Sequence, residues 1–196
     1  RCVIPEGSAG VCRVRFNSGG KLMVPDGYVA GLQADPIEKK PFYHVLPGSR
    51  TLSFGMLGCD YHCDFCQNWL SSQALRDPLA AARPQACTAA QIVQLAKDGG
   101  TPVVTSTYNE PLITADWAVE VFRLAKASGL RTAFVSNGNA TPEALAHLKP
   151  CLDFCKVDLK GFDDARYRRV TGGRLGPVLE TISALPGLGV WLEVVT

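Results

Sequence analysis

The pattern of hydrophobic and polar positions changes near residue 51. Before it, glycines and prolines separate short alternating runs at residues 11–16 and 21–24, which predict small β-hairpins. After it, apolar runs of strand length alternate with segments of helical period, a pattern typical of repeated β–α units on a parallel sheet. We therefore predict an α/β protein with a small cysteine-containing, β-rich segment over residues 1–50 and a β/α core over residues 51–196.

Within the core, both kinds of element have recognisable boundaries. Strands are predicted at residues 51–58, 102–107, 131–135, 152–159 and 190–195. Helices are predicted at residues 88–99, 113–128, 142–148 and 163–170. Thr88 and Thr141 precede two of these helices as N-caps. Because chemistry in β/α barrels collects at the carboxyl ends of the strands, functional residues are expected there.

Both ends of the sequence look cut. The chain starts at Arg1 without a methionine, and it stops at Thr196 inside a predicted strand. The expected fold is accordingly a partial (β/α) barrel, truncated so that its C-terminal part is missing.

Composition narrows the class of protein. The chain has 196 residues, is 46% hydrophobic and carries a net charge of +2, so it can bury one sizeable core and shows no basic footprint for nucleic acid. No apolar run is long enough for a membrane span and no leader precedes the first element, so we expect no membrane partner and a cytoplasmic protein. Eight cysteines in clusters favour metal ligation in a reducing compartment.

Cys59, Cys63 and Cys66 form a C-x3-C-x2-C motif directly after the first core strand. Thiolates suit iron–sulfur clusters, zinc and copper(I). A structural zinc would recruit a fourth ligand, such as His62 or a distant cysteine, whereas a cubane cluster held by three cysteines leaves one iron open. Cys2 and Cys12 are either ligands of a second metal or buried free thiols.

Polar residues also follow the next two strands. Asn109 and Glu110 end the second strand, where a carboxylate offers oxygen acceptors to a ligand ammonium. Ser136 and Asn137 end the third and offer hydrogen-bond partners to hydroxyl or carboxylate groups. Each stretch also fits an ordinary turn at a strand end.

The fourth strand alternates between two faces, because side chains in a strand have period two. The face predicted to meet the helices carries Cys155, Val157 and Leu159. The face predicted to line the barrel interior carries Lys156, Asp158 and Lys160. These charges either contact substrate or cofactor, or form an internal ion pair. Cys151 and Cys155 are expected to be buried thiols.

The cysteine motif, with the aromatic Phe65 before its last cysteine, resembles the signature loop of the radical S-adenosylmethionine (radical SAM) enzymes. The order of segments, from residues 3–15 through 107–111 to 157–161, resembles the AmmeMemoRadiSam-system branch, relatives of the pyruvate formate-lyase activating enzymes. The resemblance implies a 4Fe-4S cluster on the three cysteines, with S-adenosylmethionine on the open iron. The implied cofactor-side residues are Phe65, Asn109, Glu110, Ser136, Asn137 and Asp158. Tyr108 and Asn109 stand where two glycines are usual in the motif that ends in Glu110.

The implied reaction is reductive cleavage of S-adenosylmethionine to a 5'-deoxyadenosyl radical, which removes hydrogen from an unidentified substrate, either a small molecule or a protein. An external electron donor of flavodoxin or ferredoxin type is implied as partner. Neither a catalytic residue nor the hydrogen donor is identified. Two alternatives from other classes are a zinc-stabilised binding module and a simple iron–sulfur electron carrier.

Overall fold

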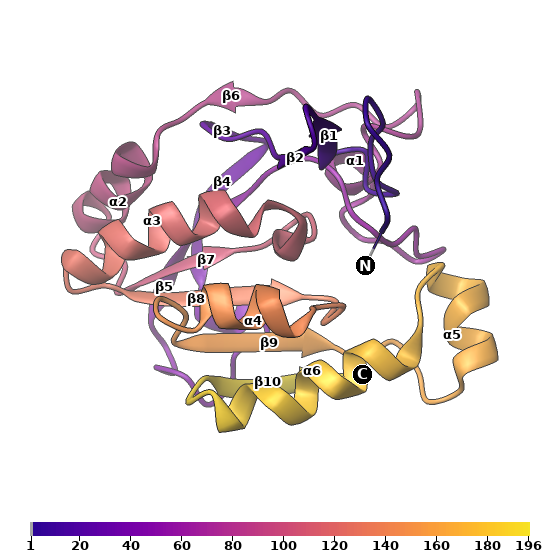
Figure 1. Cartoon of the computed structure of the whole chain (residues 1–196). Coiled ribbons are helices and arrows are strands. Elements are labelled where there is room, and N and C mark those ends of the chain that lie inside the picture. The colour runs from indigo at the N-terminus through magenta and orange to yellow at the C-terminus, as the bar shows by residue number, and fades with distance from the viewer. Residues whose placement is uncertain (1) are drawn as a thin grey trace.

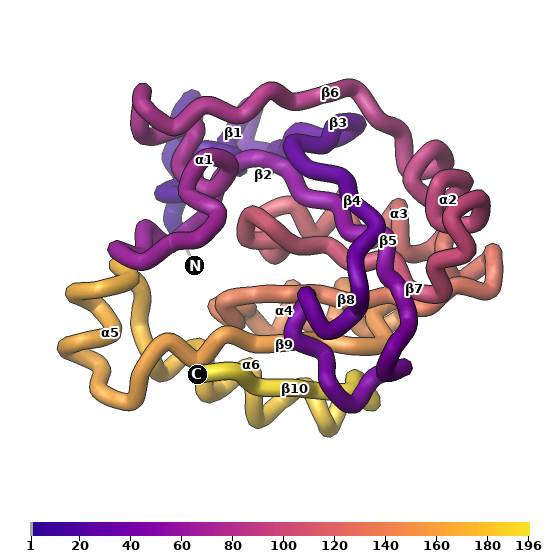
Figure 2. The backbone as a smooth tube through the Cα atoms, turned by 180° about the vertical axis from the view of Figure 1, so that it is seen from behind, coloured from indigo at the N-terminus to yellow at the C-terminus, as the bar shows by residue number. Residues whose placement is uncertain are grey.

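The computed structural model of the chain describes residues 2–196, and its centre is a six-stranded sheet (Figure 1). In sheet order the strands are β10 (Trp191–Val195), β9 (Phe154–Asp158), β8 (Arg131–Ser136), β7 (Val103–Ser106), β5 (Arg50–Gly55) and β4 (Gly31–Pro36). All neighbours are parallel except β4, which pairs antiparallel with β5. Over the described residues the sheet is open and does not close into a barrel (Figure 2).

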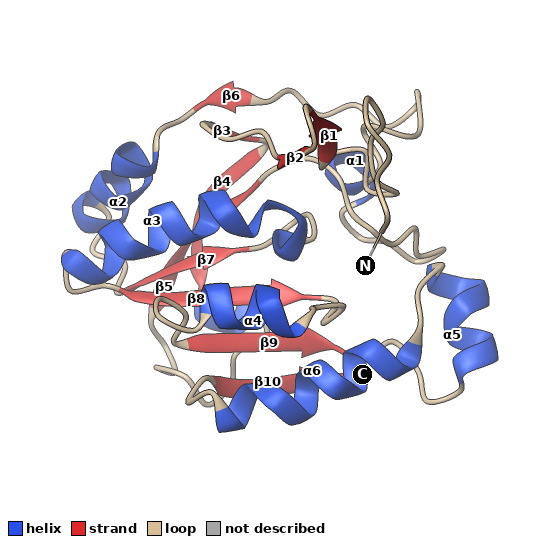
Figure 3. Ribbon diagram, viewed as in Figure 1, coloured by secondary structure: helices blue, strands red, loops and turns tan. Residues whose placement is uncertain are grey.

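Helices cover one face of this sheet, as Figure 3 shows. They are α2 (Ala89–Asp98), α3 (Ala115–Ala127), α4 (Pro142–Leu148) and α6 (Leu175–Gly187). Helix α5 (Asp164–Thr171) stands apart at the end where the parallel strands point. The smaller elements are β1 (Phe16–Ser18), β2 (Lys21–Met23), β3 (Tyr28–Val29), β6 (Gln85–Ala86), α1 (Trp69–Ser72) and two 3-10 turns, Ile37–Lys39 and Pro111–Thr114.

The core between the helices and the sheet is built around aromatic rings. Phe54 of β5 packs edge-on against Trp117 of α3 with ring centroids 5.3 Å apart, and Phe122 of α3 lies 5.4 Å from Phe134 of β8. Such pairs add to the stabilisation from buried area alone. The carboxyl ends of the parallel strands lie side by side at one edge of this packed sheet. The packing therefore sets the positions of the loops that follow the strands.

The predicted class and the parallel order of strands are confirmed. Each predicted core strand and helix is present within a few residues of its expected bounds. The prediction of a strand at residues 11–16 is wrong, because the first hairpin strand begins only at Phe16. Helix α6 was missed, although Val178, Thr181 and Leu185 are buried at helical spacing. The boundary near residue 50 stays a prediction.

Within residues 2–196, no helix combines the length and the apolar composition that a membrane crossing requires.

A buried ion pair lies on the sheet face away from the helices. The Lys40 ammonium is 2.9 Å from the Asp35 carboxylate, and the Lys40 side chain is only 5% exposed. Burial opposes ionisation of Asp35, but hydrogen bonds and charges from Lys39 and Lys40 outweigh it and lower the pKa of Asp35 to about 2. Burial lowers the pKa of Lys40. Asp35 therefore compensates a charge that is costly to bury.

Asp35→Asn is expected to reduce the free energy of unfolding by about 3–5 kcal/mol at pH 7, because it leaves the Lys40 ammonium buried without a counter-charge. The effect is measured by urea unfolding. Since the folded-state pKa of Asp35 lies below its unfolded value of about 4, this contribution is complete above pH 4 and is lost as pH falls toward 2. The control is Lys39→Met, which removes a 62% exposed partner and is expected to cost at most about 1 kcal/mol. Equal losses in the two variants would contradict the role of burial.

Candidate cluster and cofactor site

The cysteine loop follows β5 at the carboxyl end of the sheet and is held from outside by α5. The main-chain nitrogens of His62 and Asp64 donate to the carbonyls of Thr171 and Val170, both at 3.0 Å. These carbonyls belong to the last turn of α5, where helix carbonyls lack partners within the helix. The helix end and the loop therefore complete each other's backbone hydrogen bonding.

A second set of contacts fixes the loop from inside. Gln73 donates to the carbonyl of Tyr61 at 3.1 Å, and the Arg76 guanidinium donates to the carbonyls of Tyr61 and Cys59. Arg76 could not be predicted from the sequence, because it stands alone after a short helix and belongs to no motif or periodic pattern. Its role comes from spatial proximity alone.

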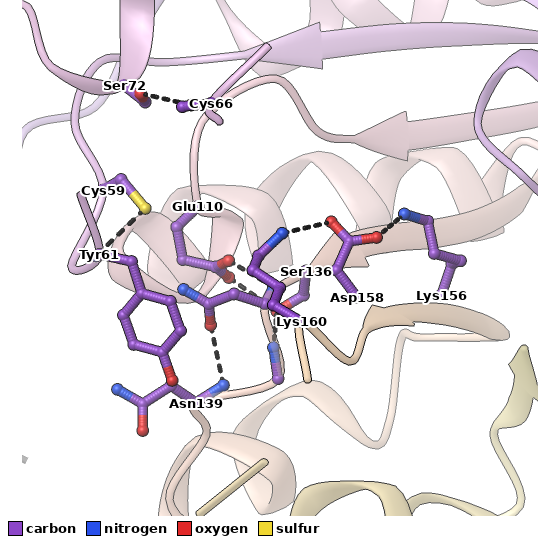
Figure 4. A network of polar contacts seen from close by, with 12 residues as sticks. Cys59, Tyr61, Cys66, Ser72, Glu110, Ser136, Asn139, Lys156, Asp158 and Lys160 are labelled. Atoms are coloured by element: carbon purple, nitrogen blue, oxygen red, sulfur yellow. Dashed lines mark hydrogen bonds and ion pairs between the residues drawn. The ribbon is translucent and has the colours of Figure 1, made fainter. Parts of the chain in front are cut away.

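Two of the three motif cysteines, Cys59 and Cys66, have polar neighbours near their sulfurs (Figure 4). The amide of Tyr61 donates to Cys59 Sγ at 3.3 Å, and Cys66 Sγ lies 3.2 Å from Ser72 Oγ. Burial raises the pKa of Cys59, and it raises that of Cys63 to about 11. Within residues 2–196, no three His, Cys, Asp or Glu side chains are arranged as a metal site. The ligand role of the cysteines therefore stays a prediction.

Glu110, at the start of the turn after β7, is buried among hydrogen-bond donors. Its carboxylate accepts from Ser136 Oγ and from the Asn137 amide at 2.7 Å each, and from the Leu112 amide at 3.0 Å. Burial and the nearby charge of Asp60 raise the pKa of Glu110, and these hydrogen bonds oppose the rise. Among residues 2–196, no lysine or arginine forms an ion pair with it.

Asp60, inside the cysteine motif, connects the loop to the end of β8. Asn137 Nδ2 donates to one oxygen of Asp60 and Asn139 Nδ2 to the other, both at 2.7 Å. Asp60 was not predicted as a site residue. Any residue can stand at its position in the cysteine motif, and its partners Asn137 and Asn139 lie far away in the sequence. The structure thus joins the cysteine loop, Glu110 and the Ser136–Asn137 pair into one network.

The end of β9 has the predicted division of faces. Cys155, Val157 and Leu159 lie in the core beneath the helices. On the other face Asp158 lies between two ammonium groups, those of Lys156 and, at 3.2 Å, Lys160 (Figure 4). The internal ion pair is therefore present. Burial opposes the charge of Lys160, but Asp158 and other acidic neighbours raise its pKa.

The remaining predicted residues differ in how free their side chains are. Asn109 Oδ1 accepts from the Met56 amide at 2.9 Å and its Nδ2 donates to the Glu110 carbonyl, so this side chain is engaged within the protein. Phe65 is 56% exposed, with Lys160 Nζ 5.8 Å from its ring centroid.

The cysteines outside the motif are separate from this network. Cys151 and Cys155 are buried thiols, as predicted. Cys12 is buried but Cys2 is exposed, so the alternative of two buried thiols holds only for Cys12.

The fold and the site define a class of protein: an open β/α sheet with a three-cysteine loop after its first parallel strand and buried polar groups at the next strand ends. The Radical SAM superfamily matches residues 55–196, and the chain belongs to that family. Membership implies S-adenosylmethionine and an iron–sulfur cluster as cofactors.

Two relatives of the chain extend this comparison. The chain is 35% identical over 194 residues to Uncharacterized protein MJ0808 of Methanocaldococcus jannaschii, with 98% of the chain covered. It is 27% identical over 143 residues to the pyruvate formate-lyase-activating enzyme of Listeria monocytogenes serovar 1/2a, with 68% of the chain covered. The predicted kinship with the activating enzymes is thereby confirmed. The chain spans 56% of the length of each relative.

Among solved structures, Streptococcus suis SuiB bound to its precursor peptide SuiA is similar in fold. The TM-score is 0.56 at 17% sequence identity, covering 72% of this chain and 31% of SuiB.

Gly173 leaves the space in which the Tyr61 ring lies, since a β-carbon there would overlap that ring. We expect Gly173→Ala to displace Tyr61, disturb the cysteine loop and cost about 1–3 kcal/mol of stability. Unfolding curves measure the cost, and iron per chain after reconstitution measures the loop. The control is Gly176→Ala in α6, where a β-carbon meets no atom within 4 Å. If both variants retain iron and stability, the packing of Tyr61 does not matter to the loop.

Proposed function

We propose that Cys59, Cys63 and Cys66 bind a 4Fe-4S cluster and that the adjoining network binds S-adenosylmethionine for radical chemistry. The observation that carries the proposal is Glu110, a buried carboxylate near the cysteine loop that has hydrogen-bond donors but, among residues 2–196, no ion-pair partner; Lys160 acts on it only through its charge. Buried charges in proteins are paired or bind a ligand. The ammonium group of S-adenosylmethionine supplies the charge that Glu110 lacks.

The donor set also fits the cluster. Three thiols on one short loop are soft ligands suited to iron–sulfur chemistry, and cluster binding replaces their protons. When bound, the reduced cluster supplies the electron that cleaves S-adenosylmethionine to a 5'-deoxyadenosyl radical.

The residues of the chain then have orienting and shielding tasks. Glu110 holds the amino group, while Ser136 and Asn137 fix the Glu110 carboxylate through the contacts already described. The side chain of Asn109 and its amide are engaged within the protein, so its proposed contact with the same amino group is through its carbonyl oxygen. Phe65 would lie near the adenine. Asp158, at the end of β9, would contact the cofactor from a neighbouring strand. The packed sheet wall limits access of water and stray hydrogen donors.

The partners are proposed from kinship. A flavodoxin- or ferredoxin-type protein reduces the cluster. The substrate is a protein or a small molecule; the names of two relatives, activating enzymes for pyruvate formate-lyase and for 4-hydroxyphenylacetate decarboxylase, favour a protein.

The decisive test is electron paramagnetic resonance of anaerobically reconstituted, dithionite-reduced protein with and without S-adenosylmethionine. We expect a reduced-cluster signal that changes when the cofactor is added. Cys63→Ala is expected to abolish the signal, whereas the control Cys151→Ala, in the buried core, retains it. A zinc-loaded, silent protein would indicate a zinc-stabilised module, and a cluster indifferent to the cofactor would indicate an electron carrier.

Glu110→Gln is expected to weaken S-adenosylmethionine binding at least tenfold, because hydrogen bonds to charged groups contribute about 1.5–3 kcal/mol. Titration of the reduced-cluster signal with the cofactor gives the dissociation constant. The control is Glu120→Gln on the exposed face of α3, which is expected to bind normally. Unchanged affinity in Glu110→Gln, with a full complement of iron, would remove Glu110 from the cofactor site.

A further inference from the structure

We propose that Tyr108 is a positioning residue for the cofactor. Its side chain is anchored against the sheet and holds the turn from Thr107 to Glu110 in the conformation that presents the Glu110 carboxylate to the cofactor. This inference rests on the proposed function, since it concerns the binding of S-adenosylmethionine by Glu110. It assigns a task to the buried Asp35–Lys40 pair, which the proposed chemistry does not otherwise use.

The backbone of Tyr108 adopts a conformation that favours glycine. Its φ is +72°, in the left-handed region where a β-carbon is strained. Such a residue persists only where surrounding contacts over-determine it. Tyr108 therefore holds a conformation that its own backbone disfavours, and its side-chain contacts must stabilise it.

The ring of Tyr108 lies against two glycines of the sheet, whose lack of a side chain leaves a slot for it. Gly31 of β4 and Gly55 of β5 are direct partners across the antiparallel pair, next to β7 (Figure 2). A β-carbon at Gly31 would lie 3.2 Å from the Tyr108 ring, and one at Gly55 would lie 2.8 Å from Tyr108 Cβ. Glycine weakens a strand and often marks a close approach. At Gly31 the approaching group is the Tyr108 ring, and at Gly55 it is the carbonyl oxygen of Thr107 together with the Tyr108 side chain.

The far end of the ring is tethered by the buried ion pair. Lys40 Nζ donates to the Tyr108 hydroxyl at 3.1 Å, and that hydroxyl donates to Asp35 at 3.4 Å. Lys40 Nζ also lies 4.4 Å from the ring centroid, within the range of a cation–π contact. Burial raises the pKa of Tyr108 to about 12, so the hydroxyl is a neutral donor. The side chain is thus fixed along its whole length.

The turn transmits this anchoring to the site. The Thr107 amide donates to the carbonyl of Phe54 at 2.9 Å, and the Glu110 amide donates to the carbonyl of Gly58 at 3.3 Å. Gly58 immediately precedes Cys59. A shift of Tyr108 would therefore move both the carboxylate of Glu110 and the start of the cysteine loop.

The test compares Tyr108→Ala, Tyr108→Gly and Tyr108→Phe in the intact, reconstituted protein. The readouts are the S-adenosylmethionine dissociation constant from the cluster signal, iron per chain and the melting temperature. We expect Tyr108→Ala to weaken cofactor binding about tenfold, because it retains the strained β-carbon without the anchor. Tyr108→Gly should recover part of this loss, because glycine adopts a positive φ without strain. Tyr108→Phe, which keeps the ring in its slot, should lose about threefold.

Gly31→Ala is a second perturbation that leaves Tyr108 in place but narrows the slot, and it should weaken binding less than Tyr108→Ala does. Wild-type affinity in Tyr108→Ala would overturn the inference. So would a loss of affinity in Tyr108→Ala that only follows losses of iron per chain and melting temperature, since a merely structural tyrosine acts through folding alone and leaves the affinity of the cluster-loaded fraction unchanged. A wild-type protein that forms its cluster but binds no S-adenosylmethionine would instead overturn the proposed function.

Discussion

The site depends on the cost of burying the Glu110 carboxylate. An ionised carboxylate away from water needs hydrogen bonds and an opposite charge. The fold supplies the hydrogen bonds, from Ser136 and from the amides of Asn137 and Leu112, but it supplies no basic ion-pair partner among the described residues. Part of the free-energy cost of burying the ionised carboxylate is not compensated, and burial therefore raises the pKa of Glu110. A protein that needed only a stable core would have no reason to keep such a group.

That constraint explains why contacts from distant parts of the chain meet at the ends of β5, β7 and β8. Asp60 holds the asparagines after β8, the turn after β7 returns to Gly58, and the end of α5 closes the cysteine loop. Each contact limits the movement of a strand-end loop. The contacts connect loops that would otherwise move independently. Such preorganisation favours the binding of a small cofactor.

The sequence predicted the elements whose signals are local. Alternating apolar runs marked the parallel strands, and Thr88 and Thr141 marked helix starts that both form N-caps in the structure. Helix α6 was missed because Pro177 near its start and Pro186 near its end resemble punctuation between elements. The contacts of Asp60 with Asn137 and Asn139, and of Lys40 with Tyr108, could not be predicted, because each joins residues that are far apart in the sequence. The roles assigned to the cysteines and cofactor-side residues remain predictions.

The acidic groups at the strand ends differ in their partners. Asp60 and Glu110, near the ends of β5 and β7, are held by neutral donors, whereas Asp158 at the end of β9 is paired with both Lys156 and Lys160. One side of the rim is therefore short of positive charge and the other has an excess of it. Fixed charges arranged in this way create a local field that favours one orientation of a dipolar ligand. Under the proposed function, the ammonium of the cofactor's amino acid group would be directed to Glu110 and its carboxylate toward the lysines.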